Sequence, residues 1–539
     1  MNLVFVVTRS IPPHTHERSM YLRAIRMLGR GNQTHFANHR GLEPHHKDFE
    51  SLKPAQVPVT SSLSPRHAVA ATLPATTDRQ VSASRLQCWG WAGALFLLYA
   101  AFSLTQHHRL STGGFDLGIF TQAVRSYAAL GAPRSDIKGW DFNLYGDHFH
   151  PILVLLVPAY WVFPRPQTLL VAQAALLSWA VVPLICLAAK RLGKPAAHAV
   201  AVAYGLSFGV QGALAFDFHE VAFAAPLLAY GLTALVEGRW AQAAAWSAPL
   251  LLVKEEISLT AAAVGMILVL RGQRRMGLTL IAGSLLCFGL VVAYLIPTVN
   301  PQGIYPYLNN ATDGGSLSST LTFTERLTSM PLLLFTPTEK VTTLLLLSGL
   351  TCLLALFSPL SLIGLPTILI RFLSDSPTYW GTGFQYNLIL MPILFAAALD
   401  AHPRVIASRY PIVRKLGRNA GAALLCAAAP LAPWQPLQNF LLHPVDSFSL
   451  SPHATTAHQL LKRIPDGSHV EATNHLSAQL AHRTRVFLWD TQGNADWVIY
   501  DLTDPSSPRA QLKDRVANHL ANGYELSANS QDIVLLHRR

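Results

Sequence analysis

Apolar runs separated by short polar segments make up most of the middle of the chain. A helix crosses a bilayer with about 20 apolar residues, and runs near this length lie at 87–104, 168–189, 197–215, 219–236, 240–270, 276–297, 340–372, 387–401 and 419–434. Lys254-Glu255-Glu256 and Ser358-Pro359 interrupt two of them, so each of these two is expected to form two short helices. The pattern predicts an all-α polytopic membrane bundle of about eleven transmembrane helices. The shorter apolar segment 151–163 is expected to be interfacial or re-entrant.

Residues 436–539 show another pattern, with short apolar stretches between polar turns. Strands are expected at 470–472, 486–488, 497–501 and 533–536, and helices at 460–463 and 509–520. This predicts a small α/β C-terminal domain. Asp501, at the end of a strand, is better explained as a turn cap than as a ligand.

Composition supports a membrane protein, because 51% of the residues are hydrophobic and only 13% are charged. Half of the net charge of +12 lies in residues 1–85, a polar segment without apolar period that is expected to be a disordered tail. We interpret it as a solvated tail, or as the result of a misplaced start codon. The alternative, a segment that binds anionic lipid or a partner, is less favoured. A nucleic-acid partner is not expected. The predicted domains are therefore the tail 1–85, the membrane domain 86–435 and the domain 436–539.

Basic clusters predict the orientation. Lys and Arg gather at 190–194, at 271–275 and at 404–418, and such clusters stay cytoplasmic. With eleven spans, the N-terminus lies in the cytoplasm of a bacterial cell and the C-terminal domain outside the plasma membrane. The same count places five other polar segments outside: 105–150, 217–220, the Lys254 turn, 298–339 and 373–386.

The five cysteines lie in or beside apolar runs and have no metal-binding spacing. They are expected to be packing residues, in neither disulfides nor a zinc site.

Asp116 follows Gly113-Gly114-Phe115 and precedes a segment, 117–127, whose apolar residues share one helical face. It is either a helix cap or a general base at the membrane surface, and the pattern does not separate the two. Asp147, His148 and His150 follow in the same loop. They could bind a divalent cation (Mg or Mn), with Asp147 and His148 as ligands, or a diphosphate.

Further polar clusters are expected on the same side of the membrane. Charges inside so apolar a run need a polar cavity or a partner. Lys254 is a candidate for holding a phosphate, or it only pairs with Glu255 or Glu256 at a hairpin tip. Arg371 could bind a phosphate or extend to the interface. The other candidate substrate-binding residues are His219, Glu220, Glu255 and Tyr386.

Several segments carry a family resemblance: FDLGIFTQAV, GDHFHPILVLLVPAYWVFP, DFHEVAF, VKEEISL and FQYNLILMPILFAAAL. Their order resembles a family of uncharacterised bacterial polytopic membrane proteins, a domain of unknown function grouped with the GT-C superfamily of membrane glycosyltransferases. The resemblance implies a GT-C-like fold, a polyprenyl-phosphate sugar donor and a catalytic acid in the first external loop. Asp116 matches that position and Asp147 the second acid. The usual adjacent acidic pair is absent, because Leu117 follows Asp116.

The resemblance therefore implies a GT-C-type inverting glycosyltransferase. It would transfer a sugar from a polyprenyl-phosphate donor in the membrane lipid to a glycan, lipid or protein acceptor of the cell envelope. Two alternatives stay open: a transporter or flippase that uses the same charges as a pathway, and a non-catalytic envelope assembly protein.

Overall fold

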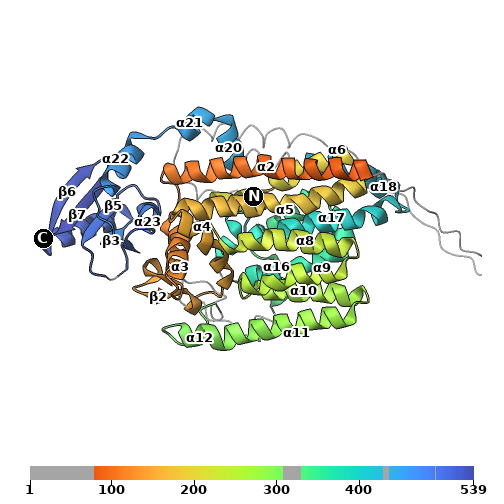
Figure 1. The fold of residues 1–539 in the computed structure, drawn as a ribbon, viewed down its shortest axis with the longest axis horizontal. Helices are drawn as coiled ribbons and strands as arrows, with labels where there is room; N and C mark the ends of the chain where they lie inside the picture. Colours follow the sequence, from red (N-terminus) through yellow and green to blue (C-terminus); the bar gives the residue numbers. More distant parts are fainter. Residues whose placement is uncertain (1–77, 308–328, 375, 429–435, 492) are drawn as a thin grey trace, which may run out of the picture. The chain divides into compact units, whose positions relative to one another are not determined.

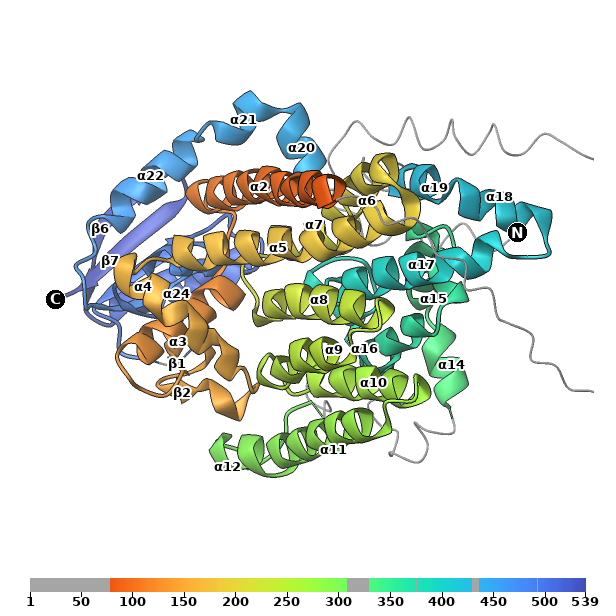
Figure 2. The ribbon, with the colours of Figure 1, turned by 45° about the vertical axis from the view of Figure 1, so that its right-hand side comes forward.

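The computed structural model describes residues 78–307, 329–374, 376–428, 436–491 and 493–539. Most of the predicted N-terminal tail lies outside these residues. The first helix, α2 (Asp78–His108), contains the first predicted span and packs along α5 (Pro166–Leu192), as Figures 1 and 2 show. Apolar side chains line the contact, because neither helix has charges in its central turns.

A group of shorter helices completes the centre of the bundle. These are α6 (Lys194–Gly205), α7 (Phe208–Ala215), α8 (Ala224–Val236) and α17 (Leu390–Ile406). Both α5 and α8 pack against α17, and many of the side chains at these contacts are fully buried. The bundle is mostly helical, as the apolar runs predicted.

Both predicted interruptions are confirmed. The run 240–270 forms α9 (Trp240–Ser247), a 3-10 segment (Ala248–Leu252), a turn at Lys254 and α10 (Ile257–Leu270). The run 340–372 forms α15 (Thr338–Leu350), two 3-10 segments and α16 (Leu365–Leu373). The second break lies next to Ser358, whose hydroxyl accepts a hydrogen bond from the amide of Leu360.

Within the described ranges, five helices are long and apolar enough to cross a membrane. They are Arg85–His108, Pro166–Leu192, Lys194–Ala215, Arg274–Val299 and Gln385–Ile406. Four shorter apolar helices accompany them: Pro151–Val162, Glu220–Val236, Ile257–Leu270 and Pro359–Leu373. The count of about eleven spans therefore stays a prediction.

Further elements complete the part of the chain that precedes the C-terminal sheet. They are α3 (Ile119–Ala128), β1 (Arg134–Ser135), β2 (Phe142–Asn143), α4 (Val157–Val162), α11 (Arg274–Leu290), α12 (Ile296–Val299), α14 (Met330–Phe335), α18 (Pro411–Arg418), α19 (Ala420–Ala428), α20 (Pro436–Leu442), α21 (Pro444–Phe448) and α22 (Pro452–Leu461). The expected helix after Asp116 is α3, and the expected short apolar helix is the 3-10 segment Pro151–Leu156 followed by α4.

The C-terminal part forms one five-stranded sheet in the order β4-β3-β5-β7-β6. Its strands are β3 (His469–Ala472), β4 (Arg485–Leu488), β5 (Trp497–Asp501), β6 (Tyr524–Ser530) and β7 (Ile533–Arg538), with helices α23 (Asn474–Leu480) and α24 (Arg509–Ala521). β3 pairs in parallel with β4 and β5, and β7 is antiparallel to its neighbours. The four strands predicted from sequence are confirmed. β6 has mixed polarity along an exposed edge, and its sequence gave no alternating signal.

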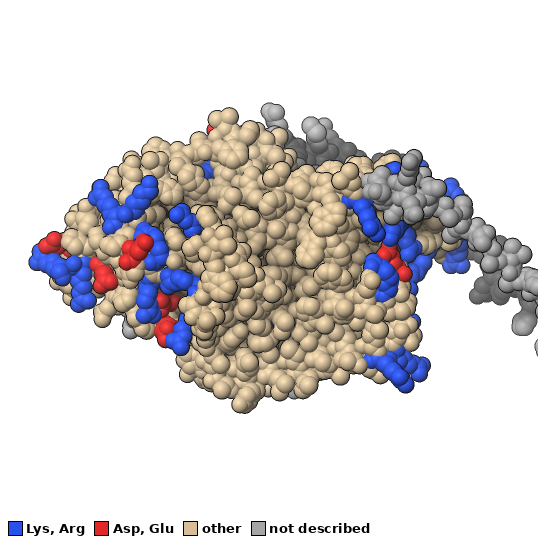
Figure 3. Space-filling view, in the orientation of Figure 1, with Lys and Arg blue, Asp and Glu red and all other residues tan. Residues whose placement is uncertain are grey.

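On the face that Figure 3 shows, the charged side chains lie at the two ends of the molecule. In Figure 3 the end near α18 carries Lys and Arg with few acids, and the end at the C-terminal sheet carries both signs. The band between them on this face is mostly free of charged side chains. Large apolar side chains of the bundle, such as Leu97, Leu278 and Leu286, are exposed. Exposed apolar surface of this kind suits a lipid environment.

The prediction that the cysteines form no disulfide is wrong for one pair. Cys88 of α2 and Cys186 of α5 form a disulfide, with Cα atoms 6.2 Å apart. Both residues look like packing residues in the sequence, because nothing in a separation of 98 residues shows that these helix faces meet.

Two glycines allow α10 and α11 to approach closely. A Cβ at Gly277 would lie 2.5 Å from the carbonyl oxygen of Gly265, and a Cβ at Gly265 would lie 2.8 Å from that of Gly277. Small residues at such contacts let helix backbones pack in a membrane.

We expect Gly277→Ala to separate these two helices and to destabilise the protein by about 1–3 kcal/mol, the usual range for overpacking. The measurement is the thermal unfolding midpoint in detergent. Gly283→Ala on the same helix is the control, because a Cβ there has no neighbour within 4 Å. Equal midpoints for the two variants would contradict the close approach.

Candidate functional site

Asp116 lies in an unusual backbone conformation. Its φ of 77° and ψ of −71° are close to those of the classic γ-turn, which is rare and strained for residues other than glycine. Its carboxylate makes no capping hydrogen bond to α3, so the structure does not show the helix-cap role. Such strain costs about 1–3 kcal/mol and persists only where surrounding contacts enforce it.

Contacts from two distant parts of the chain hold this loop. The amide of Gly113 donates a 2.6 Å hydrogen bond to Oδ2 of Asp217, and the amide of Phe115 donates a 2.9 Å hydrogen bond to Oδ1 of Asn474. Asn474 begins α23 of the C-terminal part. Gly114 packs so closely on Ser477 that a Cβ there would overlap the Ser477 hydroxyl.

His219 faces the Asp116 carboxylate. Its Nε2 lies 3.0 Å from Oδ2 of Asp116, which is within ion-pair distance. The angles do not meet hydrogen-bond geometry, and among the described residues neither ring nitrogen has a hydrogen-bond partner. The ring stacks on Phe216 at 5.1 Å, and the backbone amide of His219 donates to Oε1 of Gln173. The Asp116 side chain is 27% exposed and His219 is buried, so an incoming group can reach Asp116.

Asp217, next to this pair, is buried in a backbone conformation with φ of 58°. Burial raises its pKa well above the ordinary value, and the nearby Asp116 raises it further, against the opposing effect of the Gly113 hydrogen bond. Asp217 therefore carries less negative charge than an ordinary aspartate.

Asp147 is occupied by two partners. Its Oδ2 lies 3.0 Å from Nζ of Lys138, and its Oδ1 accepts a 2.8 Å hydrogen bond from the phenol of Tyr307. Burial raises the pKa of Asp147, but His148 and Lys138 outweigh this effect and lower the pKa well below its usual range. Asp147 is therefore a fixed carboxylate in this site.

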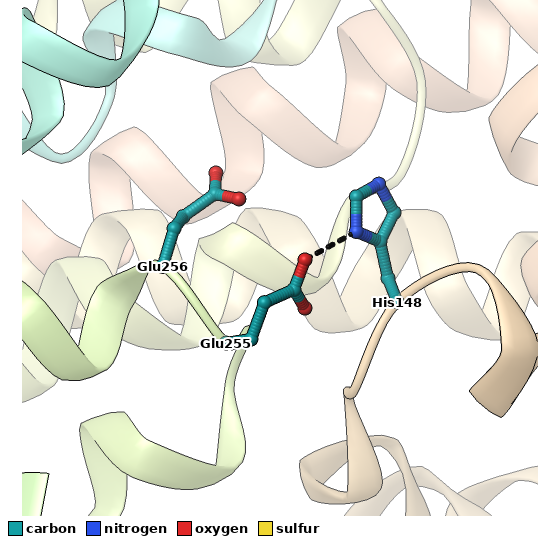
Figure 4. A group of neighbouring side chains, drawn as sticks. All are labelled: His148, Glu255 and Glu256. Carbon is teal, nitrogen blue, oxygen red and sulfur yellow. Dashed lines mark hydrogen bonds and ion pairs between the residues drawn. The ribbon is translucent and has the colours of Figure 1, made fainter. Parts of the chain in front are cut away.

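His148 pairs with Glu255, as Figure 4 shows. The distance between Nδ1 of His148 and Oε1 of Glu255 is 2.7 Å, and the His148 ring stacks on Tyr307 at 4.5 Å. Glu255 is fully buried and also accepts hydrogen bonds from the Phe149 amide and the Tyr305 phenol. Burial raises its pKa, but His148, Lys254 and the Phe149 amide together outweigh burial and lower the pKa to about 2. In turn, burial and Lys254 lower the pKa of His148, yet Glu255 and Asp147 raise it overall.

Lys254 lies between two other acids. Its Nζ is 3.5 Å from Oε1 of Glu220 and 3.7 Å from Oε1 of Glu256, and its side chain is 13% exposed. Burial lowers its pKa, but Glu256 and Glu220 raise it well above the ordinary value. The pairing of Lys254 with Glu256 matches one of the hairpin alternatives. Since Glu220 follows His219 directly, the Lys254 cluster and the Asp116 pair are adjacent.

His150 and Arg371, also candidates from the sequence, are buried and contact other parts of the protein. His150 is buried against the ring of Phe120, its Nδ1 has no partner among the described residues, and burial lowers its pKa. Arg371 is buried, and all three of its guanidinium nitrogens donate to the loop that follows it, to the carbonyls of residues 379, 381 and 386 and to Asn387. Arg371 therefore fixes the loop that carries Tyr386.

The loop that Arg371 fixes lies near the charged residues around Lys254. The rings of Tyr379 and Tyr386 contact each other at 4.5 Å. Burial raises the pKa of Tyr379, and the charge of Lys254 partly offsets this rise. The two tyrosines thus lie within electrostatic reach of Lys254.

One group of side chains has the geometry to hold a metal ion. One ligand atom each from His148, Glu255 and Glu256 lies within 4.8 Å of the others. Figure 4 shows these side chains pointing toward a common region. Burial and Glu255 raise the pKa of Glu256, while Lys254 opposes them. Asp147, the second ligand expected from sequence, does not belong to this group.

Several residues of the site were missed by sequence analysis. Glu256 was noted only as a partner for Lys254, and Asn474, Lys138, Tyr305 and Tyr307 were not considered. Asn474 is separated from Phe115 by 359 residues, so no local pattern connects them. Tyr305 and Tyr307 lie on either side of a proline in a predicted external loop. These aromatic residues were the feature from which sequence analysis could have included them in the site.

The apolar helices and the neutral band define a multi-pass integral membrane protein. The chain belongs to the family described as predicted membrane protein (DUF2079), which matches residues 106–535. This confirms the resemblance to a family of unknown function. A search of curated proteins finds no match.

Two solved structures of one protein are similar to the chain. ArnT from Cupriavidus metallidurans bound to undecaprenyl phosphate is 14% identical, with a TM-score of 0.48 over 83% of this chain and 98% of that chain. ArnT in the apo state is 15% identical, with a TM-score of 0.47 over 83% of this chain and 97% of that chain.

The contact of Gly114 with Ser477 gives a test of how the Asp116 loop is held. We expect Gly114→Ala to lower the free energy of unfolding by about 1–3 kcal/mol, because the added methyl group overlaps the hydroxyl. Ser477→Ala in the same chain should restore part of the loss. Chemical denaturation of the two single variants and the double variant measures the coupling. Simple additivity would show that the two residues do not touch.

Proposed function

We propose that this protein is a membrane glycosyltransferase of the GT-C type, which uses a polyprenyl-phosphate sugar donor. The observation that supports this proposal best is the strained loop that holds the part-exposed Asp116 carboxylate beside His219. Strained residues cluster at functional sites. The order of motifs that places Asp116 at the acid position of such enzymes supports the same assignment.

Asp116 would act as the general base. It would accept the proton of an acceptor hydroxyl while that oxygen attacks the anomeric carbon of the sugar. The bond between the anomeric carbon and the phosphate oxygen breaks, the configuration inverts, and polyprenyl phosphate leaves with the bonding electrons. His219, 3.0 Å away, would keep the Asp116 carboxylate in place.

The leaving phosphate needs positive charge nearby. The charged residues around Lys254 supply too little of it. Glu220, Glu255 and Glu256 face Lys254 and His148, so the carboxylates outnumber the cations. An anionic phosphate would be repelled unless a further cation were present. We therefore propose that His148, Glu255 and Glu256 hold a divalent cation, Mg or Mn, which when bound would supply positive charge for the phosphate.

The orientation follows from the charge distribution. The end of the bundle near α18 is rich in Lys and Arg, which favours the cytoplasmic side. Asp116 and the C-terminal sheet would then face outward, in line with a small external domain and an acceptor of the cell envelope. Asn474 gives this external part a role, because it holds the loop that carries the base.

Asp116→Asn tests the catalytic role. It should lower the turnover of lipid-linked sugar about 100- to 10,000-fold, the usual contribution of a general base. The measurement is donor consumption in reconstituted vesicles, with thermal unfolding as the check on folding. Asp446→Asn, in exposed helix α21, is the control. Normal turnover by the Asp116 variant would remove it as the base and favour the transporter or assembly alternatives.

Glu256→Gln tests the cation. We expect the purified protein to bind Mn²⁺, and the variant to bind it at least about tenfold more weakly because one ligand is lost. Titration followed by the electron paramagnetic resonance signal of free Mn²⁺ measures the affinity. Glu237→Gln, whose side chain pairs with Lys190 instead, is the matched control. Identical affinities for both variants would rule out this ligand set.

A further inference from the structure

A polar cavity is formed by residues that take no part in the site described above. Its volume is about 340 Å³. Its walls come from the end of α2 at His107, from Arg165 and Gln167 at the start of α5, and from the C-terminal part at His458 and His482. Three segments that are far apart in the sequence therefore line the same cavity.

The lining is strongly basic. Besides four histidines it includes Arg165, Lys462 and Arg483. Among the described residues, the carboxylate that pairs with these cations is Asp466, 2.8 Å from Arg483 and itself 81% exposed. Among the residues that the structure describes, neither Arg165 nor Lys462 forms an ion pair with an acid. Unpaired positive charge around a cavity attracts an anion.

One histidine of the cavity, His482, responds to burial and to this charge. Burial, together with the charges of Arg483 and Arg165, lowers the pKa of His482 to about 4, with Asp466 opposing them. Its buried Nδ1 has no hydrogen-bond partner among the described residues, and the same holds for the buried Oε1 of Gln167. An amide can present either its N–H or its oxygen, since the two are assigned from their surroundings. The cavity thus has unused hydrogen-bonding groups as well as charge.

The position of the cavity indicates where its ligand comes from. His107 and His108 end the span Arg85–His108, and Pro166 begins the span Pro166–Leu192. Just before Arg165, the side chains of Trp161, Val162 and Phe163 are exposed. Exposed aromatic and aliphatic residues next to basic ones are typical of the lipid–water boundary.

We propose that this cavity binds a phosphate group, presented by the headgroup of an anionic membrane lipid. Arg165 and Lys462 supply the charge, and His482 and Gln167 supply hydrogen bonds to the phosphate oxygens. The exposed apolar residues of α4 lie beside the acyl chains. This lipid site is separate from the Asp116 site and does not depend on the proposed transfer reaction.

The test uses the full-length protein in phosphatidylcholine vesicles that contain a photoactivatable phosphatidylglycerol. We expect cross-links to peptides that contain Arg165 and Lys462. The double variant Arg165→Gln and Lys462→Gln should need about thirtyfold more labelled lipid for half-maximal cross-linking, the loss expected for two basic residues near an anionic surface. Both residues are exposed, so the fold should persist.

Arg274→Gln with Arg275→Gln is the matched control, because it removes two exposed charges at the start of α11. It should leave these cross-links unchanged. A photoactivatable phosphatidylcholine that labels the same peptides equally well would overturn the preference for an anionic lipid. Inorganic phosphate that binds while the labelled lipid does not would overturn the lipid source, and unchanged labelling of the double variant would overturn the site.

Discussion

The hydrogen bond between the Gly113 amide and the buried Asp217 carboxylate is the contact on which the rest of the site depends. Together with the bond from Phe115 to Asn474, it forces Asp116 into a conformation that an isolated chain would avoid. A typical hydrogen bond contributes about 1 kcal/mol net, and the strain costs roughly 1–3 kcal/mol. Two such bonds and the packing of Gly114 are therefore comparable in size to the strain that they oppose.

The neighbouring charges form a crowded network in which the carboxylates are only partly balanced by cations. His148 stabilises Glu255, Lys138 stabilises Asp147, and Lys254 is shared between Glu220 and Glu256. Each interaction is strengthened by burial, which removes competing water. The negative charge of Glu256 is the least balanced by nearby cations, as its raised pKa indicates. This imbalance distinguishes the cluster from a set of structural ion pairs that only satisfy each other.

The sequence predicted the parts of this protein that depend on local pattern. Apolar runs of bilayer length indicated α2 and α5, and the charges at Lys254 marked a break between helices that the structure confirms. Strand β5 was clear because five buried or half-buried residues follow one another. Asp116 and Asp147 stood out as acids beside apolar helices.

Long-range contacts could not be predicted in the same way. His219 lies far along the chain from Asp116, and Glu255 is 107 residues from its partner His148. Cys88 and Cys186 have no spacing that indicates a disulfide. Arg371 looked suited to a phosphate because its sequence context does not show the carbonyl groups that surround it.

The role of α23 has a consequence for how the protein matures. Helix α23, which holds the Asp116 loop, follows the apolar helices in the chain and is therefore synthesised after them. An incomplete chain would insert into the bilayer yet lack Asn474 and Ser477 against its first loop. The Asp116 loop therefore gains these two contacts only after the apolar helices have been made.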